Sequence, residues 1–368
     1  MHKLILILLI FIAGVALILY PSFALQFFQN TTPITNSRVT PLLTRQSPSP
    51  KPTPTAYPTQ SARTLSSTYH VFQTFNNCGP AALSMALYYY GINESQQVLG
   101  QALRPYQNSQ GDNDDKSVTL PELGEKAKDY NLVSYHRPNG NRELIKRAIS
   151  AGFPVITRTW LTASEDIGHY RVIKGFDDTT RTLIQDDSLQ GKNLVYSYED
   201  FDEIWEKFNY EFLLLIPSEK EHLAEGILME NFDEQSSWEL AANRAERLLT
   251  ENPNDIYARF NYSVALFHTG NYANAVSEFE KVETRLPFRT LWYQIEPIEA
   301  YYELEQYDRV LQMTERILNN QNRAFSELYL IRGNIFSTRG DMGAAQAEYD
   351  KALFYNKNLK AAQTAVAQ

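Results

Sequence analysis

Cys78 is the only cysteine among the 368 residues, and it stands at the start of a run with helical character. Residues 78–90 (CGPAALSMALYYY) predict an apolar helix, with Pro80 in its first turn, where a missing N–H group costs nothing. The positive end of a helix dipole favours a thiolate over a thiol. Asn76 and Asn77 precede the cysteine and can cap that helix end or donate hydrogen bonds. The chemistry that such a thiolate offers is nucleophilic attack.

A thiolate nucleophile needs a base within hydrogen-bond reach, and the base needs an acceptor that orients it. Three histidines lie in the same part of the chain, at His70, His136 and His169. His169 begins an alternating strand-like run, HYRVIKGF, and the strand after the next turn ends at Asp186 and Asp187. Pairing of these two strands would bring one of the two carboxylates near the imidazole of His169.

The surrounding elements predict how these side chains are positioned. Helical periodicity covers 120–130 and 142–151, whereas 153–160, 169–176, 182–186 and 212–216 have the character of strands. Helices come first and the sheet afterwards, which predicts an α+β fold without βαβ alternation.

Each of these residues also has an ordinary structural interpretation. A cysteine at a helix start is often a buried small hydrophobic residue, a single histidine on a strand often belongs to the core or the surface, and an Asp-Asp pair often forms a turn.

The composition narrows the function classes: 43 acidic residues against 34 basic ones give a net charge of −9, which argues against a nucleic-acid binder. No HExxH motif, Cys/His cluster or phosphate-binding glycine loop is present, so no metal and no cofactor are expected.

The motifs around these residues resemble a known family. Gln73, Cys78-Gly79-Pro80-Ala81-Ala82, Gly168-His169-Tyr170-Arg171-Val172 and a strand ending in Asp-Asp-Ser are similar to the papain-like cysteine peptidases of the bacteriocin-processing, double-glycine type. The resemblance is closest to their stand-alone branch, which lacks a fused ABC transporter, and it covers about 65–217.

The resemblance implies a role for four residues. Cys78 would be the nucleophile, His169 the general base, Asp187 the carboxylate that orients it, and Gln73 an oxyanion donor. Gln73 lies one position closer to the cysteine than the glutamine of the family commonly does. Asp186 would replace Asp187 if the strand register shifted by one residue, because such a shift turns the side chain to the other face of the sheet.

The N-terminus predicts export or anchoring. Residues 4–20 are almost wholly apolar, Lys3 precedes them, and no further charge follows until Arg38. We expect residues 1–28 to be a membrane anchor with the bulk of the protein outside the membrane, or a cleaved signal peptide that leaves a secreted protein. Residues 29–64 are rich in Pro, Ser and Thr and predict an extended linker.

The C-terminal third is predicted to be an array of helical repeats. The turns at 270–272, 305–307 and 340–342 recur at steps of thirty-five residues. Ala275, Val310 and Ala345 share one register, which resembles the tetratricopeptide repeat. The predicted domains are therefore the anchor (1–28), the linker (29–64), a peptidase domain (65–217), a connector (218–236) and repeats (237–368).

We expect an extracytoplasmic cysteine peptidase that cleaves peptide bonds, with repeats that recruit a protein or peptide partner. Two alternatives remain open at this point. The first is a catalytically inactive, peptidase-like binding or scaffold protein, and the second is an enzyme of the same chemistry that cleaves cell-wall amides or acts as a transacylase.

Overall fold

The computed structural model describes residues 54–106, 118–319 and 322–367. The predicted anchor (1–28) and most of the predicted linker (29–64) lie outside the described residues. Among the helices within those three ranges, none is both long and apolar enough to cross a bilayer.

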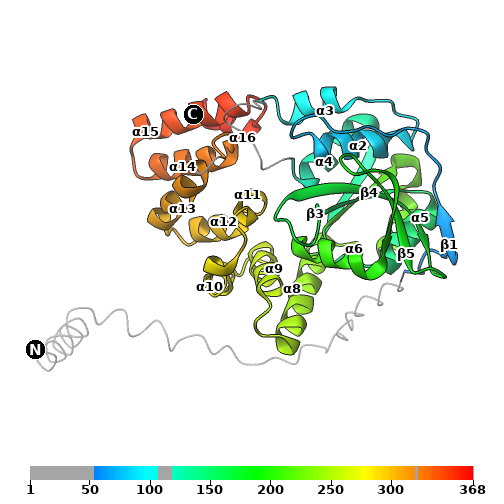
Figure 1. Cartoon of the computed structure of the whole chain (residues 1–368). Helices are drawn as coiled ribbons and strands as arrows, with labels where there is room; N and C mark the ends of the chain where they lie inside the picture. The colour runs from blue at the N-terminus through cyan, green and yellow to red at the C-terminus, as the bar shows by residue number, and fades with distance from the viewer. Residues whose placement is uncertain (1–53, 107–117, 320–321, 368) are drawn as a thin grey trace, which may run out of the picture. The chain divides into compact units, whose positions relative to one another are not determined.

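The first half of the described chain is built on one antiparallel sheet (Figure 1). The strands follow the order β2-β7-β3-β4-β5-β6, and β1 pairs with the far end of β4. Every pairing is antiparallel, as the predicted α+β class requires. The bounds are β1 Ala62–Thr64, β2 Leu132–Arg137, β3 Val155–Trp160, β4 Gly168–Asp177, β5 Thr182–Asp187, β6 Gly191–Ser197 and β7 Phe212–Pro217.

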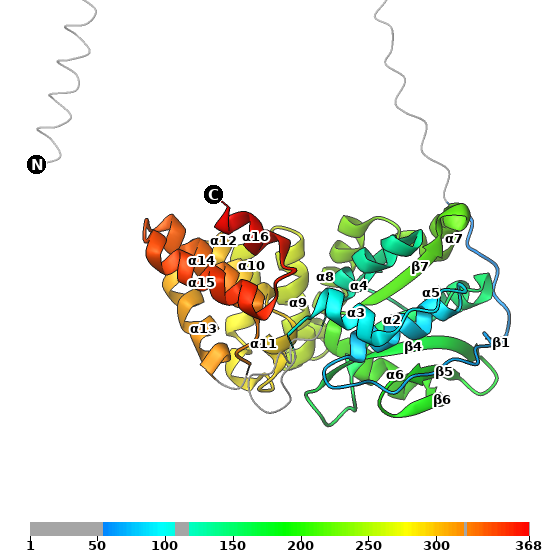
Figure 2. The same ribbon diagram turned by 90° about the horizontal axis from the view of Figure 1, so that it is seen from above.

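Helices cover both faces of this sheet. On β7, Leu213 and Leu215 pack in one core with α2 (Cys78–Tyr88), α3 (Gln96–Leu103) and α4 (Leu120–Ala127). Leu214 and Ile216 point the other way and pack with α5 (Arg142–Ala151) and α6 (Tyr198–Trp205). The unbroken apolar run of β7 follows from this burial on both faces. Figure 2 shows the sheet between its two helical layers.

Local sequence explains why the predicted helices begin where they do. Thr119 and Glu122 form a reciprocal capping box at the start of α4. The side chain of Asn141 caps α5, which ends at Gly152 with a φ of 96°. The predicted order of helices before strands is only partly right, because β2 comes between α4 and α5.

In the second half, the described residues form helices joined by turns, after a connector that contains α7 (Ala224–Leu228). Antiparallel helices follow one another through short turns (Figure 1). They are α8 Glu234–Glu251, α9 Ile256–His268, α10 Tyr272–Glu280, α11 Thr290–Tyr293, α12 Glu296–Glu303, α13 Tyr307–Asn319, α14 Ser326–Thr338, α15 Met342–Tyr355 and α16 Lys360–Val366.

The predicted thirty-five-residue register is confirmed by the backbone. Gly270, Glu305 and Gly340 occupy equivalent turns, with φ angles of 77°, 57° and 79°. This left-handed conformation favours glycine, which two of the three positions have. The small or β-branched residues that follow, Ala275 and Val310 among them, are fully buried and allow close helix packing.

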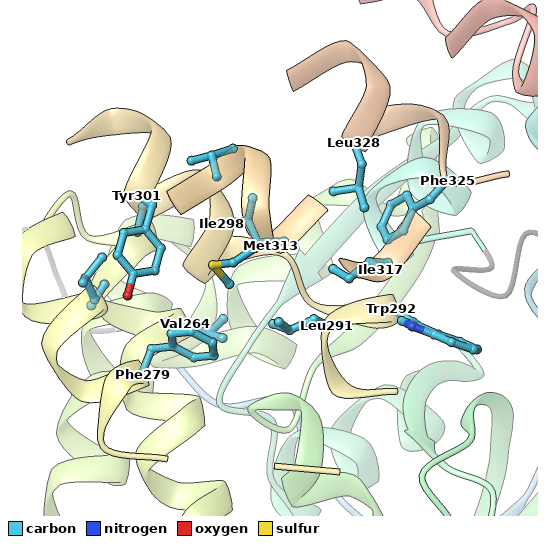
Figure 3. Close-up of a cluster of buried hydrophobic side chains, with 14 of the residues drawn as sticks. Val264, Phe279, Leu291, Trp292, Ile298, Tyr301, Met313, Ile317, Phe325 and Leu328 are labelled. Carbon is cyan, nitrogen blue, oxygen red and sulfur yellow. The ribbon is translucent and has the colours of Figure 1, made fainter. Parts of the chain in front are cut away.

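One repeat is irregular. Its first helix is divided into the short α11 and the longer α12, and Pro297 lies in the first turn of α12. Leu291 and Trp292 of α11 still reach the core of the repeats, where they lie near Val264 and Ile317 (Figure 3).

Candidate active site

Cys78 is the first residue of α2, as predicted, and its side chain is buried, with 6% of the residue exposed. Gly79 permits this placement, because a Cβ there would lie 2.9 Å from Val118 and 3.5 Å from the ring of Tyr170. Of the two roles expected for Asn77, capping is not seen: it occupies the N-cap position without a side-chain cap. Its amide donates a hydrogen bond instead, to the hydroxyl of Thr74 at 2.7 Å.

His169 lies at the start of β4 and is 2% exposed. Its Nε2 atom lies 2.9 Å from Oδ1 of Asp187, at the end of β5. The register explains the contact: Asp187 lies opposite Arg171, so its side chain shares a face of the sheet with His169, two residues earlier on β4. The structure therefore brings together the predicted histidine and the preferred aspartate.

Asp187 is held as a carboxylate. Burial raises its pKa, but the hydrogen bond and charge of His169, the charge of Arg171 and the backbone N–H of Gln190 outweigh burial and lower the pKa to about 2. An ionised carboxylate can only accept hydrogen bonds, so Nε2 of His169 carries the proton. Nδ1 is then the ring nitrogen left for Cys78.

The imidazole is stabilised in its charged form. Burial lowers the pKa of His169, but hydrogen bonds with Asp187 and Cys78, together with their charges, produce a net rise. Cys78 and Asp187 thus both form hydrogen bonds with the imidazole of His169. A histidine that favours its imidazolium form is suited to accept a proton as a general base.

The alternative carboxylate, Asp186, lies on the other face of the sheet. Its Oδ1 accepts a hydrogen bond from Nζ of Lys174 at 2.6 Å and one from the backbone N–H of Asn193 at 2.9 Å. Both Lys174 and Asp186 are almost fully buried. Asp186 therefore belongs to a buried ion pair, away from His169.

Gln73 is linked to the same end of β5. Its backbone N–H donates to the carbonyl of Ser188 at 2.7 Å, and its side-chain Oε1 accepts from the Ser188 hydroxyl at 2.8 Å. The second of these bonds uses Oε1 of the side-chain amide, and Nε2 is the donor of that amide. Neither bond goes to Cys78 or His169, so the structure connects Gln73 to the site through the residue after Asp187.

The roles of two contributors were missed, although both residues stand in the motifs quoted from the sequence. The first is Ser188, which holds Gln73, and the second is Arg171, which donates from Nη1 to Oδ2 of Asp187 at 2.7 Å. Arg171 follows His169 by two positions on a strand, so the two-residue period of β structure was a usable signal for it. Ser188 stands in the quoted Asp-Asp-Ser motif, but its contact with Gln73 joins distant parts of the chain and could not be predicted from that motif.

The other two histidines have different partners. Nε2 of His70 donates to the backbone carbonyl of Asp187 at 2.9 Å, which places this ring beside the site without a side-chain contact to Cys78. His136 pairs with the buried Glu211 at 2.7 Å. Within the described ranges, no group of three or more His, Cys, Asp or Glu side chains is arranged to hold a metal ion.

Comparisons with known proteins match parts of the chain. The sequence model of the Peptidase_C39 like family matches residues 57–212. No curated protein matches the chain. Among solved structures, the peptidase domain of Streptococcus ComA, a bi-functional ABC transporter involved in quorum sensing, is 23% identical, with a TM-score of 0.33, over 40% of this chain and 96% of its own.

Two further structures are each similar to a part of the chain. A double glycine motif protease from an AMS/PCAT transporter, in complex with the leader peptide, is 21% identical over 42% of this chain and 95% of its own, with a TM-score of 0.33. A thermophilic TPR protein of Thermus thermophilus is 22% identical over 36% of this chain and 72% of its own, with a TM-score of 0.30.

The family match covers the helix that begins at Cys78, both strands of the His169–Asp187 pair and most of the sheet. Residues 57–212 therefore match the Peptidase_C39 like family, which supports a cysteine peptidase, and a domain of helical repeats follows them.

Proposed function

We propose that this protein is an extracytoplasmic cysteine peptidase that uses Cys78, His169 and Asp187 as a catalytic triad and Gln73 as an oxyanion donor. The observation that carries the proposal is the buried 2.9 Å contact between His169 and Asp187, together with the hydrogen bond between Cys78 and the same imidazole. A structural cysteine needs neither an ionised partner nor an oriented histidine.

The first half of the reaction is acylation. The Cys78 thiolate attacks the carbonyl carbon of the scissile amide, and the electron pair of the C=O bond moves to oxygen. The backbone N–H of Cys78 and Nε2 of Gln73 donate to that oxyanion. The tetrahedral intermediate collapses, the C–N bond breaks, and the imidazolium of His169 gives its proton to the leaving amine.

The second half is deacylation. Neutral His169 removes a proton from water as the water oxygen attacks the thioester carbonyl. The C–S bond then breaks, a carboxylic acid leaves, and Cys78 is again the thiolate beside an imidazolium. Asp187 stays ionised throughout and holds the ring, as its pKa of about 2 allows.

The location and the partners are part of the same proposal. The apolar run at 4–20 after Lys3 supports a membrane anchor, or a signal peptide, that places the peptidase domain outside the cytoplasmic membrane. The helical repeats support a role in recruiting a protein or peptide, because stacked helix pairs present an extended surface.

Cleavage of a defined peptide library by the chain that starts at residue 54 tests the proposal. We expect mass spectrometry to detect new peptide termini with the wild type and none with Cys78→Ala or His169→Ala. Incubation with purified peptidoglycan tests the cell-wall alternative, since release of cell-wall peptides without cleavage of the library would replace the peptidase assignment with an amidase. Absence of both activities would favour a binding protein.

A further inference from the structure

We propose that the helical repeats position the catalytic base: Arg289 and Tyr293 hold the β3–β4 hairpin whose end carries His169. This inference rests on the proposed role of His169. It assigns to the repeats a part in catalysis that differs from recruitment of a partner, and it makes Arg289 and Tyr293 positioning residues.

The first contact is an ion pair at the tip of the hairpin. Asp166 lies three residues before His169 and binds Arg289 twice. The backbone N–H of Arg289 donates to Oδ2 at 3.0 Å, and Nη1 donates to Oδ1 at 2.7 Å. Two bonds from one residue restrict both the position and the orientation of the carboxylate.

The second contact lies one residue before the histidine. The ring of Tyr293 packs so closely on Gly168 that a Cβ at this position would lie 2.9 Å from the ring. The carbonyl of Tyr293 accepts a hydrogen bond from Nη2 of the buried Arg158, on β3, at 2.5 Å. Tyr293 therefore contacts both strands of the hairpin.

The hairpin is short and closed, so a displacement at its tip reaches its base. The backbone N–H of Leu161 donates to the carbonyl of Ile167 at 2.8 Å. From the sheet side, Nη2 of Arg171 donates to the carbonyl of Leu161 at 2.6 Å. Arg171, which also binds Asp187, thus holds the loop from the sheet side, and Arg289 holds it from the repeats.

The repeats provide a firm support for these contacts. Arg289 and Tyr293 flank Leu291 and Trp292, which are buried in the core of the repeats beside Ile317 (Figure 3). A buried aromatic and a buried leucine fix the backbone between the two contact residues. The irregular α11 thus links the repeat core to the hairpin that precedes His169.

Another contact between repeats and peptidase domain supplies a matched control. Arg104, at the end of α3, pairs with Glu327 of α14 at 3.2 Å. This ion pair also joins the two domains, but it lies on an element that carries neither Cys78 nor His169. Loss of either ion pair would loosen the contact between the domains. Only loss of the Asp166–Arg289 pair would displace His169.

The experiment measures the rate of iodoacetamide alkylation of Cys78 against pH in the chain that starts at residue 54. The variants are Asp166→Ala, Arg289→Ala, Asp166→Asn and Arg289→Lys, with Glu327→Gln as the control and His169→Ala as the reference for loss of the base. The ion pair is partly exposed, so its loss should cost little stability and the variants should fold.

We expect Asp166→Ala and Arg289→Ala to lower the alkylation rate at pH 6 about tenfold and to move the acid limb of the profile to higher pH, since small misplacements of a catalytic group are costly. Asp166→Asn and Arg289→Lys should recover part of the loss, and Glu327→Gln should stay within about twofold of the wild type.

Three results would overturn the inference. If wild type and His169→Ala have the same profile, the proposed base is wrong and the inference fails with it. If the wild type depends on His169 but the Asp166 and Arg289 variants match it, the proposed function stands and the positioning role is refuted. If Glu327→Gln shifts the profile as much as Asp166→Ala, general loosening of the domains explains the effect.

Discussion

Arg171 and Asp187 form an ion pair in which neither side chain is exposed and Nη1 lies 2.7 Å from Oδ2. The other oxygen of Asp187 accepts from His169 and from the backbone N–H groups of Leu189 and Gln190. Together these hydrogen bonds support one orientation of the carboxylate, and the orientation of His169 depends on it.

Removal of Arg171 should leave the buried carboxylate of Asp187 without one of its two charged partners. We expect Arg171→Met to lower the free energy of unfolding by about 3–5 kcal/mol, because the desolvated carboxylate keeps its cost and loses its compensation. Arg171→Lys should lose less stability, since it keeps the charge but cannot bind Asp187 and the Leu161 carbonyl in the same way. Urea unfolding followed by tryptophan fluorescence measures both, and equal losses would contradict this account.

Substitution of the two neighbouring aspartates should have different effects, one on the reactivity of Cys78 and the other on stability. Asp187→Asn should lower the alkylation rate of Cys78 at pH 6 by a factor on the order of a hundred, because the ring loses its ionised partner. Asp186→Asn should lower stability by weakening the buried pair with Lys174 and leave the pH dependence of alkylation unchanged. A shifted profile in Asp186→Asn would show that the two roles are assigned to the wrong residues.

Gln73 should act in the transition state. We expect Gln73→Ala to lower kcat about a hundredfold with little change in KM, which is the size of effect seen for loss of one oxyanion donor. Ser188→Ala should give a smaller loss, since it removes the hydroxyl that orients the amide. Steady-state kinetics on a peptide from the library test provide the measurement. A rise in KM at constant kcat would instead indicate a binding residue.

Acidification should lower the free energy of unfolding, because Asp187 becomes protonated. Its pKa is lowered from 3.8 to about 2, so the stability it contributes is present above about pH 4 and is lost as the pH falls toward 2. The shift corresponds to about 2 kcal/mol. The free energy of unfolding of wild type and Asp187→Asn should therefore converge between pH 5 and pH 2, and a constant difference over this range would refute the assignment.

Much of this site could be predicted because its residues carry local signals. The helix start at Cys78, the strand-like run from His169 and the turn before β5 are all visible in short stretches of sequence. In the structure α2 begins at Cys78, and β4 begins one residue earlier than predicted, at Gly168. The choice between Asp186 and Asp187 could not be made from spacing alone. It depends on strand register, which is set by packing on both faces of the sheet.

The missed elements lack such signals. β6 is an edge strand whose residues are mostly half-exposed, so it shows no apolar alternation. β2 is buried at only two of its six positions. The contacts of Tyr293 with Gly168 and of Arg289 with Asp166 join residues more than a hundred positions apart, and no local pattern predicts a pairing between a repeat and a hairpin.

The most direct test of the central claim is the pH dependence of alkylation at Cys78, compared between the wild type and His169→Ala. Cys78 is the sole thiol, so a single mass shift reports its reactivity. Activation by His169 predicts rapid labelling that persists to about pH 6 in the wild type and is lost in the variant. Slow labelling in both proteins, rising only near the ordinary thiol pKa of about 8.5, would contradict a catalytic role for Cys78.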